Sequence, residues 1–213
     1  MRFVRRFIAI AGLALFGLSQ QASAAVLYDN GPINGTIDGV AISGGYAVSD
    51  SFTLSQASTV TGVNFGAWNY PDVTMASVHW GIATASGIYT DTATATVTSV
   101  LTGGIGSGFF PVSADSFSTG SVSLAAGTTY YLVLQNAVAD PLSHPFFWDI
   151  NNGPSTATQL NGSPIGSESF QIIGNNVSAT PLPAALPLFA TGLGAFGLLG
   201  WRRKRKNASA IAA

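Results

Sequence analysis

Apolar side chains occupy every second position in a series of short segments between residues 25 and 178. In residues 77–82, for example, Val78, Trp80 and Ile82 alternate with Ser, His and Gly. A period of two is the repeat of a β-strand, whereas an amphipathic helix repeats about every 3.6 residues. The other segments that share this alternation, each flanked by Gly, Pro, Asn, Asp or Ser, are residues 52–54, 122–124, 146–150 and 170–172.

The pattern predicts an all-β fold. Residues 130–135 are apolar on both faces, as expected of a strand at the centre of a sheet. No long stretch rich in Leu, Glu, Lys and Ala predicts a soluble helix in this region. About nine or ten short strands with closely spaced turns indicate an antiparallel β-sandwich with a jelly-roll-like order. Gly62, within the predicted strand TVTGVNFGAW, predicts a β-bulge.

Positive charge is missing from the centre of the chain. All eight Lys and Arg residues lie before residue 7 or after residue 201, whereas all nine Asp and Glu residues lie between residues 29 and 168. Such an acidic module has no cations with which to neutralise phosphates, so nucleic acid is excluded as a partner. The chain also lacks cysteine, so the module, residues 25–178, must be stabilised by a single hydrophobic core.

The N-terminal residues 1–24 have the three parts of a secretory signal peptide. A basic start precedes an apolar run over residues 7–18, which is shorter than the roughly 20 residues of a membrane-spanning helix. Ala22 and Ala24 form an A-x-A cleavage site. We therefore expect cleavage after Ala24 and export through the inner membrane.

The C-terminal region predicts a membrane-spanning helix. Residues 184–201 are almost wholly apolar and, as a helix, would extend about 27 Å. Trp201 takes the place of an interfacial aromatic residue, and the cluster after it forms a stop-transfer signal that would hold the tail in the cytoplasm. A buried core helix is the alternative interpretation. The residues of the basic cluster are Arg202, Arg203, Lys204, Arg205 and Lys206.

A Pro-x-Pro motif precedes this helix. Its residues are Thr180, Pro181, Leu182, Pro183 and Ala184. A motif of this kind, followed by a Gly-spotted apolar helix and a basic cluster, resembles the sorting signal of PEP-CTERM proteins, in the variant that reads VPLPA. Thr180 stands where that variant has Val. The resemblance implies that residues 179–213 are recognised by an exosortase, which cuts near the motif and transfers the protein to the cell surface or extracellular matrix of a Gram-negative bacterium.

The body of the chain is similar to a choice-of-anchor module, an uncharacterised β-sandwich of bacterial surface proteins. The segments that carry the likeness include YDNGPINGT, VTGVNFGAW, LAAGTTYYLVLQNA and WDINNGPSTA. The resemblance implies a sandwich fold and no known activity.

The module contains few side chains that could take part in catalysis. It has two histidines, His79 and His144, and neither a cysteine nor a lysine that could serve as a nucleophile. A glycan hydrolase would need a carboxylate pair such as Asp140 and Asp149. We predict no enzyme, no catalytic residue and no cofactor, with a hydrolase as the remote alternative.

Metal binding has a partial basis in the sequence. The segment WDINNG offers Asp149, Asn151 and Asn152 as oxygen ligands, but their spacing does not match an EF-hand. Asn-Gly and Asp-Asn pairs also form ordinary turns. We predict no metal site, with calcium as the alternative.

Carbohydrate binding is suggested by two segments that combine aromatic and acidic residues. The candidate ligand-binding residues are Trp68, Tyr70, Trp148 and Asp149. Large aromatic residues more often anchor a core, which is the competing interpretation of the two tryptophans. The sequence therefore predicts an exported, non-enzymatic surface protein with a structural or adhesive role in the envelope or biofilm, and a carbohydrate-binding module for exopolysaccharide as the alternative.

Overall fold

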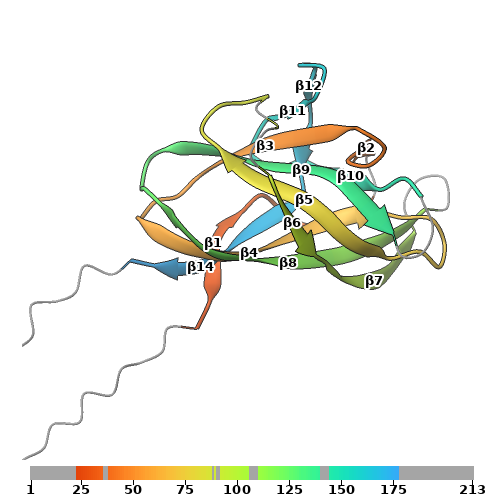
Figure 1. Cartoon of the computed structure of the whole chain (residues 1–213), viewed down its shortest axis with the longest axis horizontal. Helices are drawn as coiled ribbons and strands as arrows, with labels where there is room; N and C mark the ends of the chain where they lie inside the picture. The colour runs from red at the N-terminus through yellow and green to blue at the C-terminus, as the bar shows by residue number, and fades with distance from the viewer. Residues whose placement is uncertain are drawn as a thin grey trace, which may run out of the picture.

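The computed structural model describes residues 23–35, 38–87, 89, 92–105, 110–139 and 144–177, which form two antiparallel sheets packed face to face (Figure 1). These residues contain no helix, so the all-β prediction is confirmed for them. It follows that this part of the chain has no helix long and apolar enough to cross a membrane. Residues 1–22 of the predicted signal peptide, the sorting motif, the apolar segment and the basic cluster lie outside the described residues.

The first sheet is built around a long strand, β4. Its pairing runs in the order β1-β14-β4-β8-β7, and β10 pairs with the end of β4 and carries the short strands β2 and β13. The strands of this sheet are β1 (Ala25–Asp29), β2 (Gly39–Ala41), β4 (Ser58–Trp68), β7 (Thr98–Ile105), β8 (Pro111–Leu124), β10 (Phe147–Asn151), β13 (Ser167–Glu168) and β14 (Phe170–Asn176).

The second sheet has the order β12-β11-β3-β9-β5-β6. Its central strand, β9, pairs with β3 along one edge and with β5 along the other, which confirms the central position predicted for residues 130–135. The strands of this sheet are β3 (Ala47–Thr53), β5 (Met75–Ala83), β6 (Ala93–Thr96), β9 (Thr129–Ala139), β11 (Ala157–Gln159) and β12 (Pro164–Ile165).

The core lies between the two sheets. Phe52 of β3 contacts Phe170 of β14 edge to face, with ring centroids 6.2 Å apart. Along β5, Val78 is fully buried and Trp80 and Ile82 pack against the same core, as their alternation predicted. Because both sheets place their apolar faces inward, the sandwich is stabilised without disulfides.

The predicted bulge at Gly62 is confirmed. The register between β4 and β8 shifts between Val60 and Gly62, and β14 shifts at the matching position, between Ile173 and Gly174. A Cβ on Gly62 would lie 3.1 Å from the carbonyl oxygen of Phe117, so the close approach of β8 favours glycine here.

The described chain contains fourteen strands, more than the nine or ten predicted. The surplus consists of short pieces, β2, β11, β12 and β13, which have only two or three residues each. A segment of that length is too short to display an alternation, so only pairing with a neighbour identifies it as a strand.

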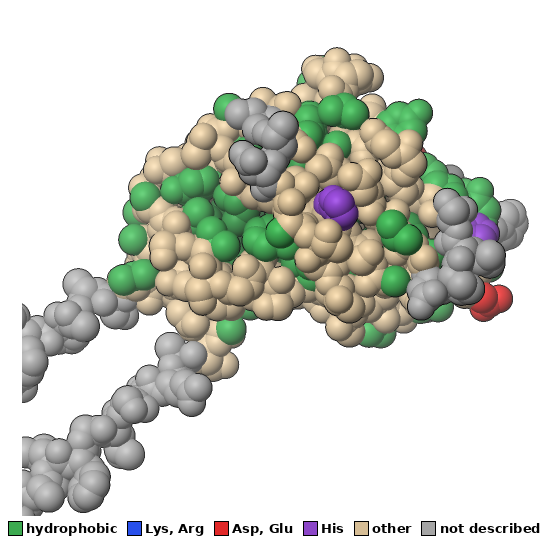
Figure 2. Space-filling view, viewed as in Figure 1, with side chains coloured by type: hydrophobic (Ala, Val, Ile, Leu, Met, Phe, Trp, Pro, Cys, Tyr) green, Lys and Arg blue, Asp and Glu red, His purple; other side chains and the backbone are tan. Residues whose placement is uncertain are grey.

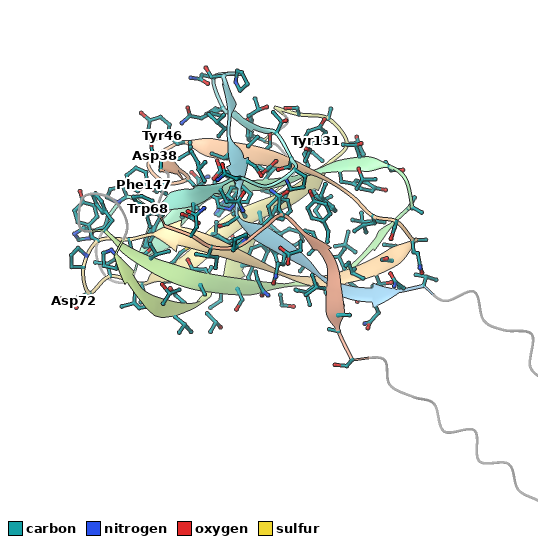
Figure 3. All side chains as sticks on the ribbon, turned by 180° about the vertical axis from the view of Figure 1, so that it is seen from behind. Asp38, Tyr46, Trp68, Asp72, Tyr131 and Phe147 are labelled. Carbon is teal, nitrogen blue, oxygen red and sulfur yellow. The ribbon has the colours of Figure 1, made fainter. Side chains whose placement is uncertain are left out.

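The ends of the described module leave the sandwich side by side. Ala25 of β1 pairs opposite Gly174 of β14, so the start of β1 and the end of β14 lie at one end of the molecule, on the left in Figure 1. We call this the proximal end. The opposite end, which we call the distal end, includes residues 43–46, 69–72, 110 and 144–147 (Figure 3).

Candidate functional site

Aromatic side chains gather at the distal end. Tyr70, which follows β4, is 37% exposed, and its ring centroid lies 5.3 Å from that of Phe110 and 5.1 Å from that of His144. Phe110 in turn contacts Phe147 of β10, at 6.2 Å between centroids. The loops that leave the sheets at this end thus hold a connected aromatic cluster at the surface.

Beside this cluster lies an open hollow of about 610 Å³. Its side-chain lining includes Tyr46, Asn136, Val138, His144 and Phe147. Tyr46 is 53% exposed, and Figure 3 places it at the same end as Phe147.

One wall of the hollow is a tight turn. The amide of Tyr46 donates to the carbonyl oxygen of Ser43 at 3.2 Å, and Gly44 and Gly45 between them have φ angles of 64° and 89°. These left-handed angles favour glycine, and no atom within 4 Å would contact a Cβ at either position. The turn therefore carries Tyr46 outward without covering it.

A second part of the lining is an irregular stretch of β9, which runs directly beside the turn, since the amide of Ala137 donates to the carbonyl oxygen of Ile42 at 2.9 Å. Its register with β5 shifts, since Gln135 pairs with His79 and Val138 with Ser77, which leaves an additional residue on β9. Asn136, in this bulge, has a φ of 48° and an exposed side chain. Bulges reorient side chains at strand ends, and this one turns Asn136 toward the hollow.

The acidic residues Asp38 and Asp72 give the distal end negative charge. Asp38 and Asp72, both exposed, lie at the distal end (Figure 3), and a smaller hollow of about 140 Å³ joins Asp38 to Trp68 and Phe147. The face in Figure 2 shows hydrophobic and uncharged side chains over its described surface, with acidic atoms only at the distal end. The described residues include neither lysine nor arginine.

The sequence-predicted ligand residues lie mostly inside the fold. Trp148 and Asp149 have no exposed surface, and Trp68 is 4% exposed. The structure joins two of them, because the indole N–H of Trp68 donates to Asp149 at 2.6 Å. The indole of Trp148 donates to the carbonyl oxygen of Ser169 at 2.9 Å. Their burial favours the interpretation of both tryptophans as core anchors and leaves Tyr70 as the exposed member of the four.

Four carboxylic side chains are buried in the module. Their exposed fractions are 1% or less, although the described residues provide no cation to pair with them. They are Asp50, Asp115, Asp149 and Glu168. Of these four, only Asp149 was among the site residues predicted from the sequence. The alternation of residues along the strands could have predicted the burial of two of them. Asp50 and Asp115 each lie two residues before a core phenylalanine, Phe52 and Phe117, and so face inward.

Asp50 is held by several donors. Its side chain accepts hydrogen bonds from the amide of Glu168 at 2.7 Å, the hydroxyl of Ser155 at 2.8 Å and the Asn30 amide group at 3.1 Å. Burial nevertheless raises the pKa of Asp50 to about 6, against the opposing effect of these hydrogen bonds.

Glu168 and Asp115 lack donors in hydrogen-bonding geometry, although the hydroxyls of Ser99 and Ser113 lie near Asp115. Neither oxygen of either carboxyl group has a hydrogen-bond partner among the described residues. Burial raises the pKa of Glu168 well above its usual value, and the charges of Asp50, Asp149 and Asp38 raise it further. Burial also raises the pKa of Asp115 to about 6, with a smaller opposing effect from nearby serine hydroxyls. Burial therefore shifts both groups toward the protonated form.

The buried carboxyl groups are poorly placed for catalysis or metal binding. Asp50, Asp149 and Glu168 have no exposed surface through which a substrate could reach them in this conformation. Asp140, the other member of the hydrolase pair considered above, lies outside the described residues. In the part of the chain that the structure describes, no group of three or more acidic, histidine or cysteine side chains is arranged to hold a metal ion. The amide of Asn151, a candidate calcium ligand, donates to the carbonyl oxygen of Asn30.

No family model, curated protein or solved structure matches this chain.

Proposed function

We propose that the protein is an exported, non-enzymatic surface module that is attached through its C-terminal end and presents its distal end outward. The observation that carries this proposal is the pairing of Ala25 with Gly174, because it brings both ends of the module to the proximal end. An attachment at the C-terminal end therefore leaves the aromatic cluster and the hollow accessible.

The beginning of the fold agrees with removal of a signal peptide. β1 begins at Ala25, the first residue after the proposed cleavage site, and Ala24 before it is exposed. Cleavage after Ala24 would therefore leave every described strand complete.

The C-terminal attachment rests on the resemblance to PEP-CTERM sorting signals. β14 ends at Asn176, four residues before Thr180, so a cut near the Pro-x-Pro motif would leave the sandwich whole. Pro181 and Pro183 favour an extended backbone that a protease or transpeptidase can bind. We propose an exosortase as the processing partner and the cell surface or extracellular matrix as the destination.

Substitution of both motif prolines tests this proposal. Pro181→Ala with Pro183→Ala should leave export unchanged, because the signal peptide and the apolar segment are intact, but should trap the full-length protein in the membrane. Pro187→Ala, outside the motif, is the matched control and should be processed normally. Mass spectrometry of the surface fraction provides the measurement. Recovery of peptides from residues 189–201 in the wild-type surface protein would show that the C-terminal segment is not removed and serves only as a membrane anchor.

The strand order supports the jelly-roll form of the sandwich. The orders β1-β14-β4-β8 and β3-β9-β5-β6 place strands from the beginning and end of the chain next to each other in both sheets, as two interlocked Greek keys do. Jelly rolls occur in lectins as well as in capsid proteins, so the fold alone does not select a function.

Binding of exopolysaccharide is a second candidate function, and the exposed Tyr70 cluster favours it. Tyr70→Ala should then weaken retention of the protein on purified exopolysaccharide. Tyr131→Ala is the control, since Tyr131 lies away from the distal end (Figure 3). Equal retention of both variants and the wild-type protein would remove Tyr70 from the binding surface.

A further inference from the structure

We propose that the hollow lined by the turn 43–46, the Asn136 bulge and residues 144–147 binds an uncharged sugar unit of a polysaccharide. This site deepens the carbohydrate-binding candidate and rests on it. It differs from the residues expected from the sequence, because its principal side chains are Tyr46 and Asn136.

The dimensions of the hollow suit a small ligand. Its volume of about 610 Å³ falls within the range of roughly 300–1,000 Å³ that is typical of ligand pockets. It is open to solvent at the distal end, so one unit of a longer polymer can enter while its neighbours remain outside.

Tyr46 provides a surface for the ring of a sugar. Half of the tyrosine is exposed, and the two glycines before it leave space around its base. The faces of pyranose rings carry C–H groups, which pack favourably against the negative face of an aromatic ring. Val138, which lines the same hollow and is 51% exposed, adds a second apolar contact.

Asn136 provides the directional contacts. A primary amide both donates and accepts hydrogen bonds, so it can bind adjacent hydroxyl groups of one sugar. Its left-handed backbone conformation is uncommon for a residue other than glycine, and such conformations are concentrated at functional sites. The backbone of Asn136 is positioned by the bulge within paired strands rather than by a loop.

The charges of the module favour an uncharged ligand over an anionic one. Phosphate, sulfate or uronate groups would meet Asp38 and Asp72 at this end and would find no lysine or arginine in the described module. A neutral, hydroxyl-rich ligand avoids that repulsion. The hollow is therefore suited to a neutral glycan rather than to an acidic one.

Affinity electrophoresis of the full chain, kept soluble with a polyoxyethylene detergent, tests the site. The gels contain a neutral polysaccharide, dextran or galactomannan, or the acidic polygalacturonate. We expect retardation by a neutral polymer only. Tyr46→Ala and Asn136→Gly should each weaken it at least about tenfold, whereas Tyr46→Phe retains the ring and should bind nearly as the wild-type protein does. Glycine at position 136 accepts the positive φ, so this variant removes the amide without straining the bulge.

The outcomes separate failure of the site from failure of the function. If no neutral polymer retards the wild-type protein, the carbohydrate-binding function itself is wrong. If retardation persists in Tyr46→Ala and Asn136→Gly but is lost in Tyr70→Ala, the function stands and the hollow is not the site. Retardation by polygalacturonate alone would show that the ligand is an acidic glycan and not a neutral one. A sedimentation shift that Tyr46→Ala abolishes without polysaccharide would reassign the hollow to contacts between copies. Thermal melting of each variant establishes that it is folded.

Discussion

Glu168 has no exposed surface and no hydrogen-bond partner for either side-chain oxygen among the described residues, and the charge of Asp50 acts on it. Removing one partner from a buried charge is costly, and here the described residues offer no cationic partner at all. The carboxyl group is therefore accommodated by remaining protonated, at a free-energy cost that grows as the pH rises above the pKa of the unfolded chain.

Glu168→Gln should stabilise the protein at pH 7 by at least about 1 kcal/mol. Because the folded-state pKa is raised, the favourable contribution of the acid is complete below the unfolded-state pKa and is lost as the pH rises toward the folded-state pKa. The stabilisation by glutamine should therefore vanish near pH 4. Denaturation of both proteins at the two pH values measures the difference. A glutamine variant less stable than the wild-type protein at pH 7 would mean that the ionised carboxylate binds a group inside the fold.

In strand β14, close packing against the backbone of β4 leaves no space for a side chain at Gly174. The register between β14 and β4 shifts at this residue. A Cβ here would overlap the carbonyl oxygen of Thr59 and approach the Cα of Val60, and both are backbone atoms of β4. Side-chain rotation cannot relieve such a contact, so the strand pair would have to separate.

Gly174→Ala should therefore lower the free energy of unfolding by more than about 2 kcal/mol. Gly62→Ala is the comparison, because its nearest contact, with the carbonyl oxygen of Phe117 at 3.1 Å, can be relieved by a small shift. Urea titration of the two variants should rank Gly174→Ala as the more destabilised. The reverse ranking would show that β14 can move away from β4 more easily than β8 can.

For the whole molecule, the buried carboxyl groups make stability depend on pH. Asp50 and Asp115 come from different sheets, and burial raises the pKa of each to about 6. Because these values exceed those of the unfolded chain, the stabilising contribution is complete below about pH 4 and is lost as the pH rises through 6. Each group accounts for up to about 3 kcal/mol over this window.

The melting temperature of the module should thus be higher at pH 4.5 than at pH 8. Asp115→Asn should reduce that dependence, since it removes one of the titrating groups. A chelator added at pH 7 should leave melting unchanged if these groups do not bind a metal ion. Higher stability at pH 8 would contradict the protonated state, and a large loss on chelation would indicate a bound cation.

Short sequence segments were sufficient to predict the all-β fold, the central position of residues 130–135 and the bulge at Gly62. The alternation of apolar residues and the preference for glycine at bulges both act over a few residues. The alternation in residues 146–150 also grouped Trp148 with Phe146 and Ile150 on one face, consistent with its burial. The predicted signal peptide and sorting signal depend on the order of segments along the chain, and their structure lies outside the described residues.

Tertiary structure alone decided which distant residues meet. The amide of Glu168 reaches Asp50 across 118 positions, and the hollow joins a turn before β3 to a bulge near the end of β9. The exposure of Tyr46 and the backbone angle of Asn136 follow from how β9 pairs with β5 and how the turn leaves the sheet. The physical reason is that strand periodicity specifies which face of a strand is apolar, whereas burial, pKa and the shape of a site depend on the neighbours that packing supplies.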